Sequence, residues 1–195
     1  MKTHFTVLII SFFSLFCYGQ TKPANYEATI NTSLATFIET LKAKKVDQAV
    51  GLIYPKYVNK VSRQQMFTVL NLVYNNPSLV LNIQNYKINK ISTPELIDHE
   101  YFSITDYMLT MKFSIAWNTI HSNEETRSMV KEQLVNTYGR ENVMYVKNGD
   151  YYAIKSPMKA VMISKDGNDW SIIPLENADQ SQLKEVLPAA ILEKI

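Results

Sequence analysis

The densest group of ionisable side chains in the sequence is the run Asp98-His99-Glu100. A histidine between two carboxylates can bind a metal or act as a general base near neutral pH. Consecutive side chains in a loop or strand point in different directions, however, and no second histidine follows at the spacing of a metal ligand. We therefore interpret the run as the charged loop of a hairpin, since loops are normally polar and exposed. His121, beside Ser122, is interpreted in the same way, as an exposed loop residue.

Asp106 is a carboxylate placed within an apolar strand pattern. Ile104 and Met108 fall on its own face of the predicted strand. A carboxylate in this position either faces water or occupies a partly desolvated pocket, where it can act as a general base. Thr110 and Lys112 on the same face favour the first interpretation, because antiparallel sheets often leave one face to solvent. Asp106 is therefore the one catalytic candidate in the sequence, and both interpretations stay open.

Aromatic residues are candidates for the lining of a ligand pocket. The candidate pocket residues are Tyr54, Tyr57, Tyr107, Phe113 and Trp117. Aromatic side chains at strand spacing are also typical of an ordinary core or of cross-strand pairs. The sequence does not decide between a pocket and a core.

Composition excludes more than the motifs propose. The chain of 195 residues has a formal net charge of +2 and only five glycines, so neither a nucleic-acid partner nor a glycine-rich phosphate loop is expected. The G-x-S-x-G, H-E-x-x-H, P-loop and dinucleotide signatures are missing from the sequence. We therefore expect no metal and no cofactor. The sequence favours a non-catalytic protein over an enzyme, without deciding between them.

Residues 1–19, MKTHFTVLIISFFSLFCYG, have the layout of a secretory signal peptide. Lys2 supplies the positive charge, an apolar run follows, and Cys17 and Gly19 are the small residues before the cleavage point. The apolar run is too short to span a bilayer stably, so an integral membrane protein is not expected. The alternatives are an N-terminal membrane anchor and lipidation at Cys17, where Phe16 occupies a position that favours a small residue.

Cleavage after Gly19 predicts an exported protein, periplasmic or secreted, with one domain over residues 20–195. The processed chain keeps 19 basic and 18 acidic residues and loses the only cysteine. Disulfides, thiolate catalysis and cysteine-bound metals are then excluded.

Hydrophobic periodicity predicts the elements that must position the candidate residues. The predicted helices are Tyr26–Ala43, a short helix from Asp47 that ends before Pro55, Ser62–Tyr74, Asn123–Tyr138 and a final helix from Asp179. Ser62 with Gln65, and Ser122 with Glu125, are typical of capping boxes at helix starts. Positive charge after Leu41 ends the first helix favourably.

The rest of the chain alternates with the period of two that predicts strands. The apolar positions change parity after Ile83, which predicts a bulge near Gln84-Asn85. A strand over residues 101–117 would extend about 56 Å, far beyond a radius of gyration of about 16 Å. It must therefore curl, bend or break near Thr105-Asp106. Asn148-Gly149 and Asp166-Gly167-Asn168 predict two further hairpins.

These elements predict an α+β fold in which N-terminal helices pack on a strongly curved antiparallel sheet, with one inserted helix and a short C-terminal helix. The helices are expected to cover one face of this sheet. The layout resembles the NTF2-like superfamily, a cone of one long and two shorter helices with a curved sheet. The resemblance rests on residues 28–57, including Lys45-Val46-Asp47-Gln48-Ala49-Val50, and on Asp169-Trp170-Ser171-Ile172-Ile173. It covers most of residues 26–175, although the helix at 123–138 departs from the simplest cone. The chain also resembles small exported proteins of Bacteroidetes-type bacteria in signal peptide and composition.

Three functions are compatible with this sequence. The first is a non-catalytic domain that binds a small apolar ligand, a peptide or a partner protein in the concavity of the sheet. The second, which the resemblance implies, is an isomerase or dehydratase with Asp106 as base and Tyr107 or Tyr101 as hydrogen-bond donor. Neighbours on a regular strand face opposite sides, which counts against the pair Asp106 and Tyr107. The third is an envelope protein–protein interaction module. Ligand, pathway and oligomeric state are not predicted.

Overall fold

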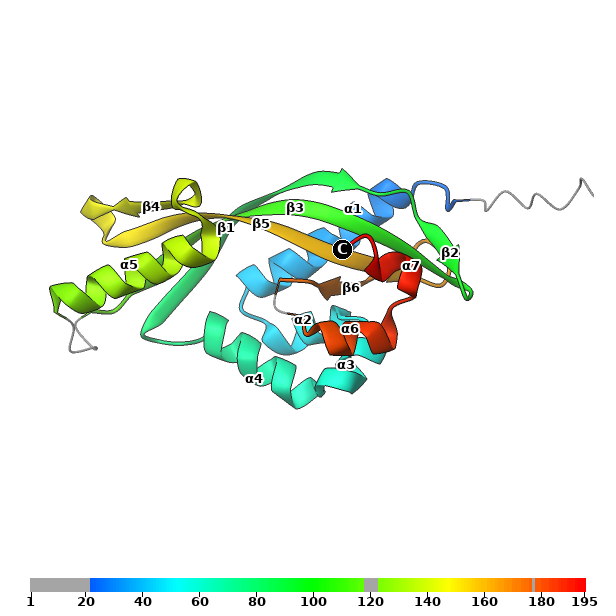
Figure 1. The fold of residues 1–195 in the computed structure, drawn as a ribbon, viewed down its shortest axis with the longest axis horizontal. Coiled ribbons are helices and arrows are strands. Elements are labelled where there is room, and N and C mark those ends of the chain that lie inside the picture. Colours follow the sequence, from blue (N-terminus) through cyan, green and yellow to red (C-terminus); the bar gives the residue numbers. More distant parts are fainter. Residues whose placement is uncertain (1–21, 118–122, 177) are drawn as a thin grey trace, which may run out of the picture.

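The computed structural model describes residues 22–117, 123–176 and 178–195. The helices are α1 (Tyr26–Lys42), α2 (Val46–Leu52), α3 (Pro55–Val61), α4 (Arg63–Tyr74), α5 (Glu124–Tyr138), α6 (Gln180–Val186) and α7 (Ala189–Leu192), with 3-10 turns η2 (Arg140–Asn142) and η3 (Lys147–Gly149). The strands are β1 (Leu79–Ile91), β2 (Glu95–Ile97), β3 (Glu100–Ile115), β4 (Val143–Val146), β5 (Tyr151–Ser164) and β6 (Ser171–Pro174). The predicted α+β class, with helices before a curved antiparallel sheet, is confirmed (Figure 1).

One antiparallel sheet of six strands organises the described chain. Its main path runs β1-β3-β5-β4, and β2 adds to β3 while β6 adds to β5. The long strands β1, β3 and β5 pair over most of their length and sweep across the molecule in Figure 1. The sheet does not close on itself, so it keeps free edges.

The length of the central hairpin is accommodated by bulges in β1. The register of β1 on β3 shifts between Ile83 and Asn85, which confirms the predicted bulge, and shifts again between Ile88 and Lys90. β3 itself continues without a break through Thr105. Because a bulge increases the local twist, the hairpin curves without interrupting its central strand.

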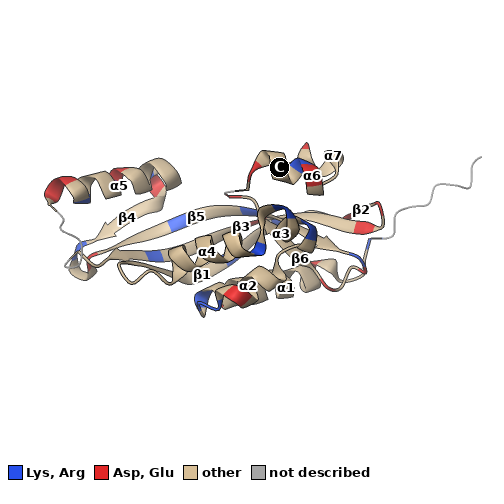
Figure 2. Cartoon of the chain, turned by 90° about the horizontal axis from the view of Figure 1, so that it is seen from below, with Lys and Arg blue, Asp and Glu red and all other residues tan. Residues whose placement is uncertain are grey.

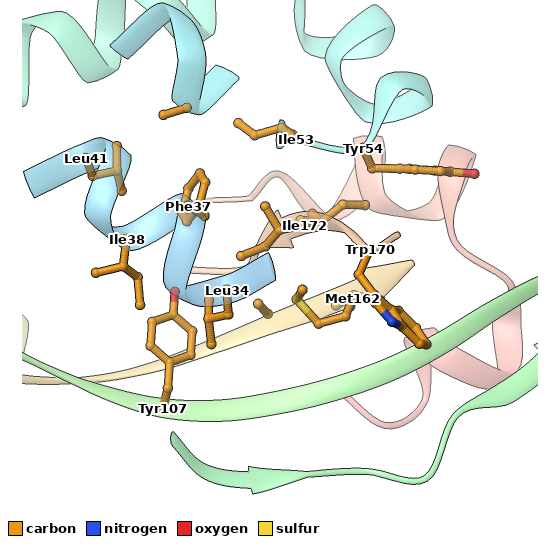
Figure 3. Packing of buried hydrophobic residues seen from close by; sticks show 14 of the residues in the cluster. Leu34, Phe37, Ile38, Leu41, Ile53, Tyr54, Tyr107, Met162, Trp170 and Ile172 are labelled. Carbon is orange, nitrogen blue, oxygen red and sulfur yellow. The ribbon is translucent and has the colours of Figure 1, made fainter. Parts of the chain in front are cut away.

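One face of β3 packs against α1 to form the core. Tyr107 is 2% exposed, and Figure 3 shows its ring extending from β3 toward Leu34 and Ile38 of α1. The indole N–H of Trp170 donates to Thr29 Oγ1 of α1 at 2.9 Å, which satisfies its polar atom inside this packing. The apolar stripe of α1 thus occupies this side of the sheet, as the helical spacing predicts.

Helices lie on both sides of the sheet, whereas the sequence predicts cover on one face. Figure 2 shows α1 and α2 on one side and α5, α6 and α7 on the other. Phe102, Val161 and Ile163 belong to the side opposite α1 by register, yet all three are buried. Ile191 of α7 is also buried, at 1% exposure. The C-terminal helices therefore cover one end of the second face, and its middle stays open.

Several local predictions need correction. The segment Pro55–Val61 forms a separate helix, α3, with Pro55 in the first turn, where a missing N–H costs little. Ser62 has a φ of 77° and its side chain does not cap α4. The C-terminal helix is interrupted at Leu187, which is extended, so that α7 starts after Pro188.

The cap of α6 and both late hairpins agree with the predictions, whereas the cap of α5 is Asn123 and not the predicted Ser122. Asn123 caps α5 by accepting from the Thr126 N–H, whereas the predicted cap Ser122 lies outside the described residues. Asp179 caps α6 through the Ser181 N–H. Both late hairpins turn where the Asn-Gly and Asp-Gly-Asn signals predict.

The predicted signal peptide and Cys17 lie outside the described residues, as does His121. Within the described ranges, no helix combines the length and the apolar character needed to cross a membrane.

Candidate ligand-binding site

A gap in the pairing of β5 sets up the candidate site. On the edge away from β3, β4 pairs with residues 151–154 of β5 and β6 pairs with residues 160–163. Pro157 lies between these two stretches, and proline has no N–H to donate to a ladder. β4 and β6 are therefore separate strands on one edge, with an open interval between them.

The chain that leaves β6 closes one side of this interval. Leu175 N donates to Lys159 O at 3.0 Å, and the carboxylate of Glu176 accepts from Lys159 N. The Glu176 carboxylate thus accepts a hydrogen bond that a backbone carbonyl of a paired strand would otherwise accept. These two bonds fix Leu175 and Glu176 beside the middle of the sheet.

A groove of about 400 Å³ lies at this place. Its lining residues are Asn89 of β1, Asp106 and Tyr107 of β3, Pro157, Met158 and Lys159 of β5, and Leu175 and Glu176 after β6. A groove of this size matches the lower part of the range for small-molecule sites. Four separate segments of the sequence meet in it.

Strand register places most of the polar lining on the side of the sheet opposite α1. Asp106 pairs with Lys159, and Met108 pairs with Pro157, so these residues share one face. The second bulge of β1 lies directly beside Asp106 and leaves Asn89 outside the regular register. Tyr107 leaves β3 on the other face, toward α1 (Figure 3).

The polar side chains of the groove have free bonding capacity. Within the described part of the chain, the side chains of Asn89, Asp106 and Lys159 make no hydrogen bond or ion pair. The apolar lining comes from Pro157 and its neighbours Met158 and Leu175. A few unpartnered polar groups beside apolar walls are the usual composition of a ligand site.

Glu176 is accessible to solvent although protein atoms surround its carboxyl group, as expected for a residue at the rim of a groove. Burial raises the pKa of Glu176 above its ordinary value, while backbone N–H groups, first that of Lys159, oppose the shift. Burial also raises the pKa of Tyr107, with smaller contributions from the charges of Glu176 and Tyr74.

The candidate pocket aromatics are not brought together. Tyr54, Tyr57 and Tyr107 are buried in the core, and only Tyr107 also lines the groove. Phe113 and Trp117 are half-buried near the opposite end of β3. Trp117 there stacks under the guanidinium of Arg127, 4.5 Å from the ring centroid. Their assignment to a ligand pocket remains a prediction.

Asp106 lies on the wet face that its neighbours indicate, half-buried and at the groove. Its side chain and that of Tyr107 leave the strand on opposite faces, so the two do not enter one regular pocket together. This geometry does not favour the pair as base and hydrogen-bond donor of one reaction.

The run Asp98-His99-Glu100 is divided between a turn and the core, which corrects the prediction of a single charged loop. Asp98 and His99 both have positive φ, 49° and 66°, and make the tight turn between β2 and β3. Glu100 is 7% exposed and accepts hydrogen bonds from Tyr54 Oη and Lys56 Nζ, each at 2.8 Å. Its carboxylate is an internal anchor.

A second groove, of about 530 Å³, lies on the outer surface of α1 and includes Ala35, Glu39 and Lys45. Thr32, Thr36 and Thr40 are among its lining residues, and their hydroxyl groups donate to backbone carbonyls of their own helix. The described ranges contain no group of three His, Cys, Asp or Glu residues placed to hold a metal ion.

Sequence reasoning missed Asn89, Lys159 and Glu176 as site residues. Asn89 and Lys159 look like ordinary surface positions in the sequence, and only the pairing of β1, β3 and β5 brings them together.

The chain matches none of the protein-family models compared with it, and no curated protein matches its sequence.

Proposed function

We propose that this chain is an exported, non-catalytic domain of the NTF2-like type that binds a small, mostly apolar ligand. The groove between Asp106 and Leu175 is the observation that carries this proposal, because it combines apolar walls with a few unpartnered polar groups. The signal-peptide layout of residues 1–19 supports export. The order of helices before a curved antiparallel sheet supports the NTF2-like assignment.

The groove replaces the concavity beside α1 as the proposed site. Ile30 and Leu34 of α1 are fully buried, with 0% exposure, together with Tyr107 of the sheet. A ligand on that side would have to displace core side chains, at a cost of several kcal/mol for each large apolar residue. The groove on β5 needs no such displacement.

Fluorescence of the neutral probe N-phenyl-1-naphthylamine tests the groove. Asn89→Trp and Leu175→Trp fill it from two sides, and Asn89 is exposed, so its replacement leaves the core intact. Both variants are expected to lose probe binding. Ala35→Trp, in the groove on α1, is the matched control and keeps it. Probe binding unchanged in both groove variants, with circular dichroism showing folded protein, contradicts the proposal.

Native mass spectrometry of protein purified from its own envelope provides a second test. A retained small molecule that is lost from Asn89→Trp supports a binding function. A second candidate function, an interaction module, is favoured by the exposed Met129, Met144 and Tyr145 around α5 and β4. Light scattering after size exclusion distinguishes it, since self-association that Met144→Lys abolishes indicates an interface.

A further inference from the structure

The open middle of the second sheet face carries a concentration of lysines. The register places Lys87, Lys90, Lys112, Lys155 and Lys159 on this one face. Within the described residues none of the five makes an ion pair. We call this set the lysine face. The chain as a whole is close to neutral, so the positive charge of this face is a local feature.

Lys159 lines the groove, and Lys87 and Lys90 lie within two positions of Asn89, another lining residue. Lys90 of β1 and Lys159 of β5 are the direct register partners of Asp106, one on each neighbouring strand. Lys87 of β1 and Pro157 of β5 are, in the same way, the two register partners of Met108. Directly opposed residues on neighbouring strands have Cβ atoms about 5 Å apart. Three lysine positions therefore neighbour Asp106 on this face, and within the described residues none of the three makes an ion pair with its carboxylate.

The second carboxylate of the groove does not cancel this excess. Glu176 points one oxygen at the N–H of Lys159. Burial of its carboxyl group also raises its pKa, so Glu176 becomes protonated at a higher pH than an ordinary glutamate does. An acidic group above Lys90 and Lys159 meets more positive than negative charge.

We propose that the ligand of the groove is an anionic amphiphile, with an apolar body against Pro157 and Leu175 and an acidic head at Lys87, Lys90 and Lys159. The head is a carboxylate, a sulfate or a phosphate monoester, each of which a lysine binds as a point charge. This inference rests on the proposed function, because it specifies the ligand of the same groove.

The shape of the surface favours a small ligand over a membrane or a long polymer. Figure 2 shows α5 on one side and α6 and α7 on the other side of the open sheet, all on the face away from α1. A helix is about 10 Å across, so these helices keep a flat surface away from lysines that lie on the sheet. A long polymer bound parallel to the strands would collide with these helices.

Displacement of N-phenyl-1-naphthylamine by ten-carbon competitors tests the head group. Decanoate is expected to displace the probe at about a tenfold lower concentration than decanol, since several weak ion pairs act together. Decyltrimethylammonium is expected to compete less well than decanol. The triple variant Lys87→Gln, Lys90→Gln, Lys159→Gln should lose the preference for decanoate over decanol, measured as the ratio of the two competitor concentrations that displace the probe equally.

A matched triple variant controls for net charge. Lys44→Gln, Lys131→Gln and Lys184→Gln remove three exposed lysines that lie outside the groove and make no ion pair with any described residue. This variant is expected to keep the full preference for decanoate. A preference lost equally from both triple variants would overturn the proposal, because it would then reflect net charge alone.

The remaining outcomes separate the two levels of inference. Equal displacement by decanoate and decanol, with probe binding still abolished by Leu175→Trp, overturns the anionic head and leaves the groove function intact. Probe binding that neither Asn89→Trp nor Leu175→Trp changes overturns both. Binding of heparin or of phosphatidylglycerol vesicles, without displacement by decanoate, identifies the lysine face as a surface for polyanions or lipid and overturns the amphiphile proposal.

Discussion

Lys56 Nζ donates to Glu100 Oε2 at 2.8 Å, across 44 positions of sequence. Tyr54 Oη donates to the same oxygen at 2.8 Å. The Glu100 side chain is 9% exposed, whereas that of Lys56 is 62% exposed, so the carboxylate is the buried member of the pair. This cluster connects the start of α3 to the first residue of β3 and fixes the helical layer to the sheet.

Replacement of Glu100 by glutamine is expected to destabilise the protein by about 1–3 kcal/mol, because Lys56 loses its counter-charge and a buried polar group loses its best partner. Tyr54→Phe removes one hydrogen bond and is expected to cost about 1 kcal/mol. Urea unfolding followed by circular dichroism measures both. Glu39→Gln, which breaks the exposed pair with Lys42, is the control and should change stability by less than about 1 kcal/mol. Equal effects of Glu39→Gln and Glu100→Gln would contradict the anchoring role.

Lowering the pH is expected to weaken the cluster of Tyr54, Lys56 and Glu100. Burial by itself would raise the pKa of Glu100, but the hydrogen bonds from Lys56 and Tyr54 outweigh it and hold the pKa below its ordinary value of 4.5. A carboxylate whose pKa is lower in the folded state adds stability above its unfolded pKa and loses it as pH falls through the folded value. Unfolding free energies of wild type and Glu100→Gln should therefore differ at pH 7 and converge as the pH falls through the lowered pKa of Glu100. A difference that stays constant from pH 7 to pH 3 contradicts this assignment.

Two glycines are expected to respond in opposite directions to alanine. Gly167 has a φ of 79°, and a Cβ there would lie 2.3 Å from Pro23 Cβ, so Gly167→Ala should cost about 1–3 kcal/mol. At Gly51 of α2, no described atom beyond its chain neighbours and its own helix backbone lies within 4 Å of the added Cβ. Gly51→Ala should stabilise the helix by about 0.5–1 kcal/mol. Thermal unfolding measures both, and a neutral Gly167→Ala would contradict the tight turn between β5 and β6.

Helix α5 is expected to open more easily than the rest of the fold. It has no buried residue, and Arg127 attaches it through the Trp117 ring at 4.5 Å and Asp150 at 3.2 Å. Arg127→Gln should lower the local opening free energy by about 1 kcal/mol, with little change in global unfolding. Hydrogen exchange of α5 amides measures it. Lys131→Gln on the same helix is the control, and equal exchange in both variants would exclude the attachment through Arg127.

Patterns within a single element allowed most of the fold to be predicted. The change of parity after Ile83 indicated the bulge, and the Asn-Gly and Asp-Gly-Asn turns indicated the hairpins. α3 was missed because Pro55 was interpreted as the end of the preceding helix, whereas it occupies the first turn of a new one. Cover on the second face was missed because it depends on where α6 and α7 dock, which periodicity does not specify.

The candidate site was less predictable than the fold. The alternation of β3 correctly placed Asp106 on the face away from the core, because side-chain direction in a strand follows position alone. The partners of Asp106 in the groove depend on the register of β1 and β5, which no local pattern encodes. Glu100 illustrates the same limit, since its partners Tyr54 and Lys56 lie in a distant helix region.

The interruption of β5 at Pro157 has a consequence for the protein among its own copies. An unpaired strand edge is a template on which another chain can add a strand and begin to aggregate. Pro157 offers no N–H at the centre of that interval, and the exposed Lys155 beside it repels the same segment of a second molecule. Pro157, which leaves the groove open, therefore also prevents a second molecule from adding a strand to this edge. The variant Pro157→Val is expected to form fibrils in concentrated solution.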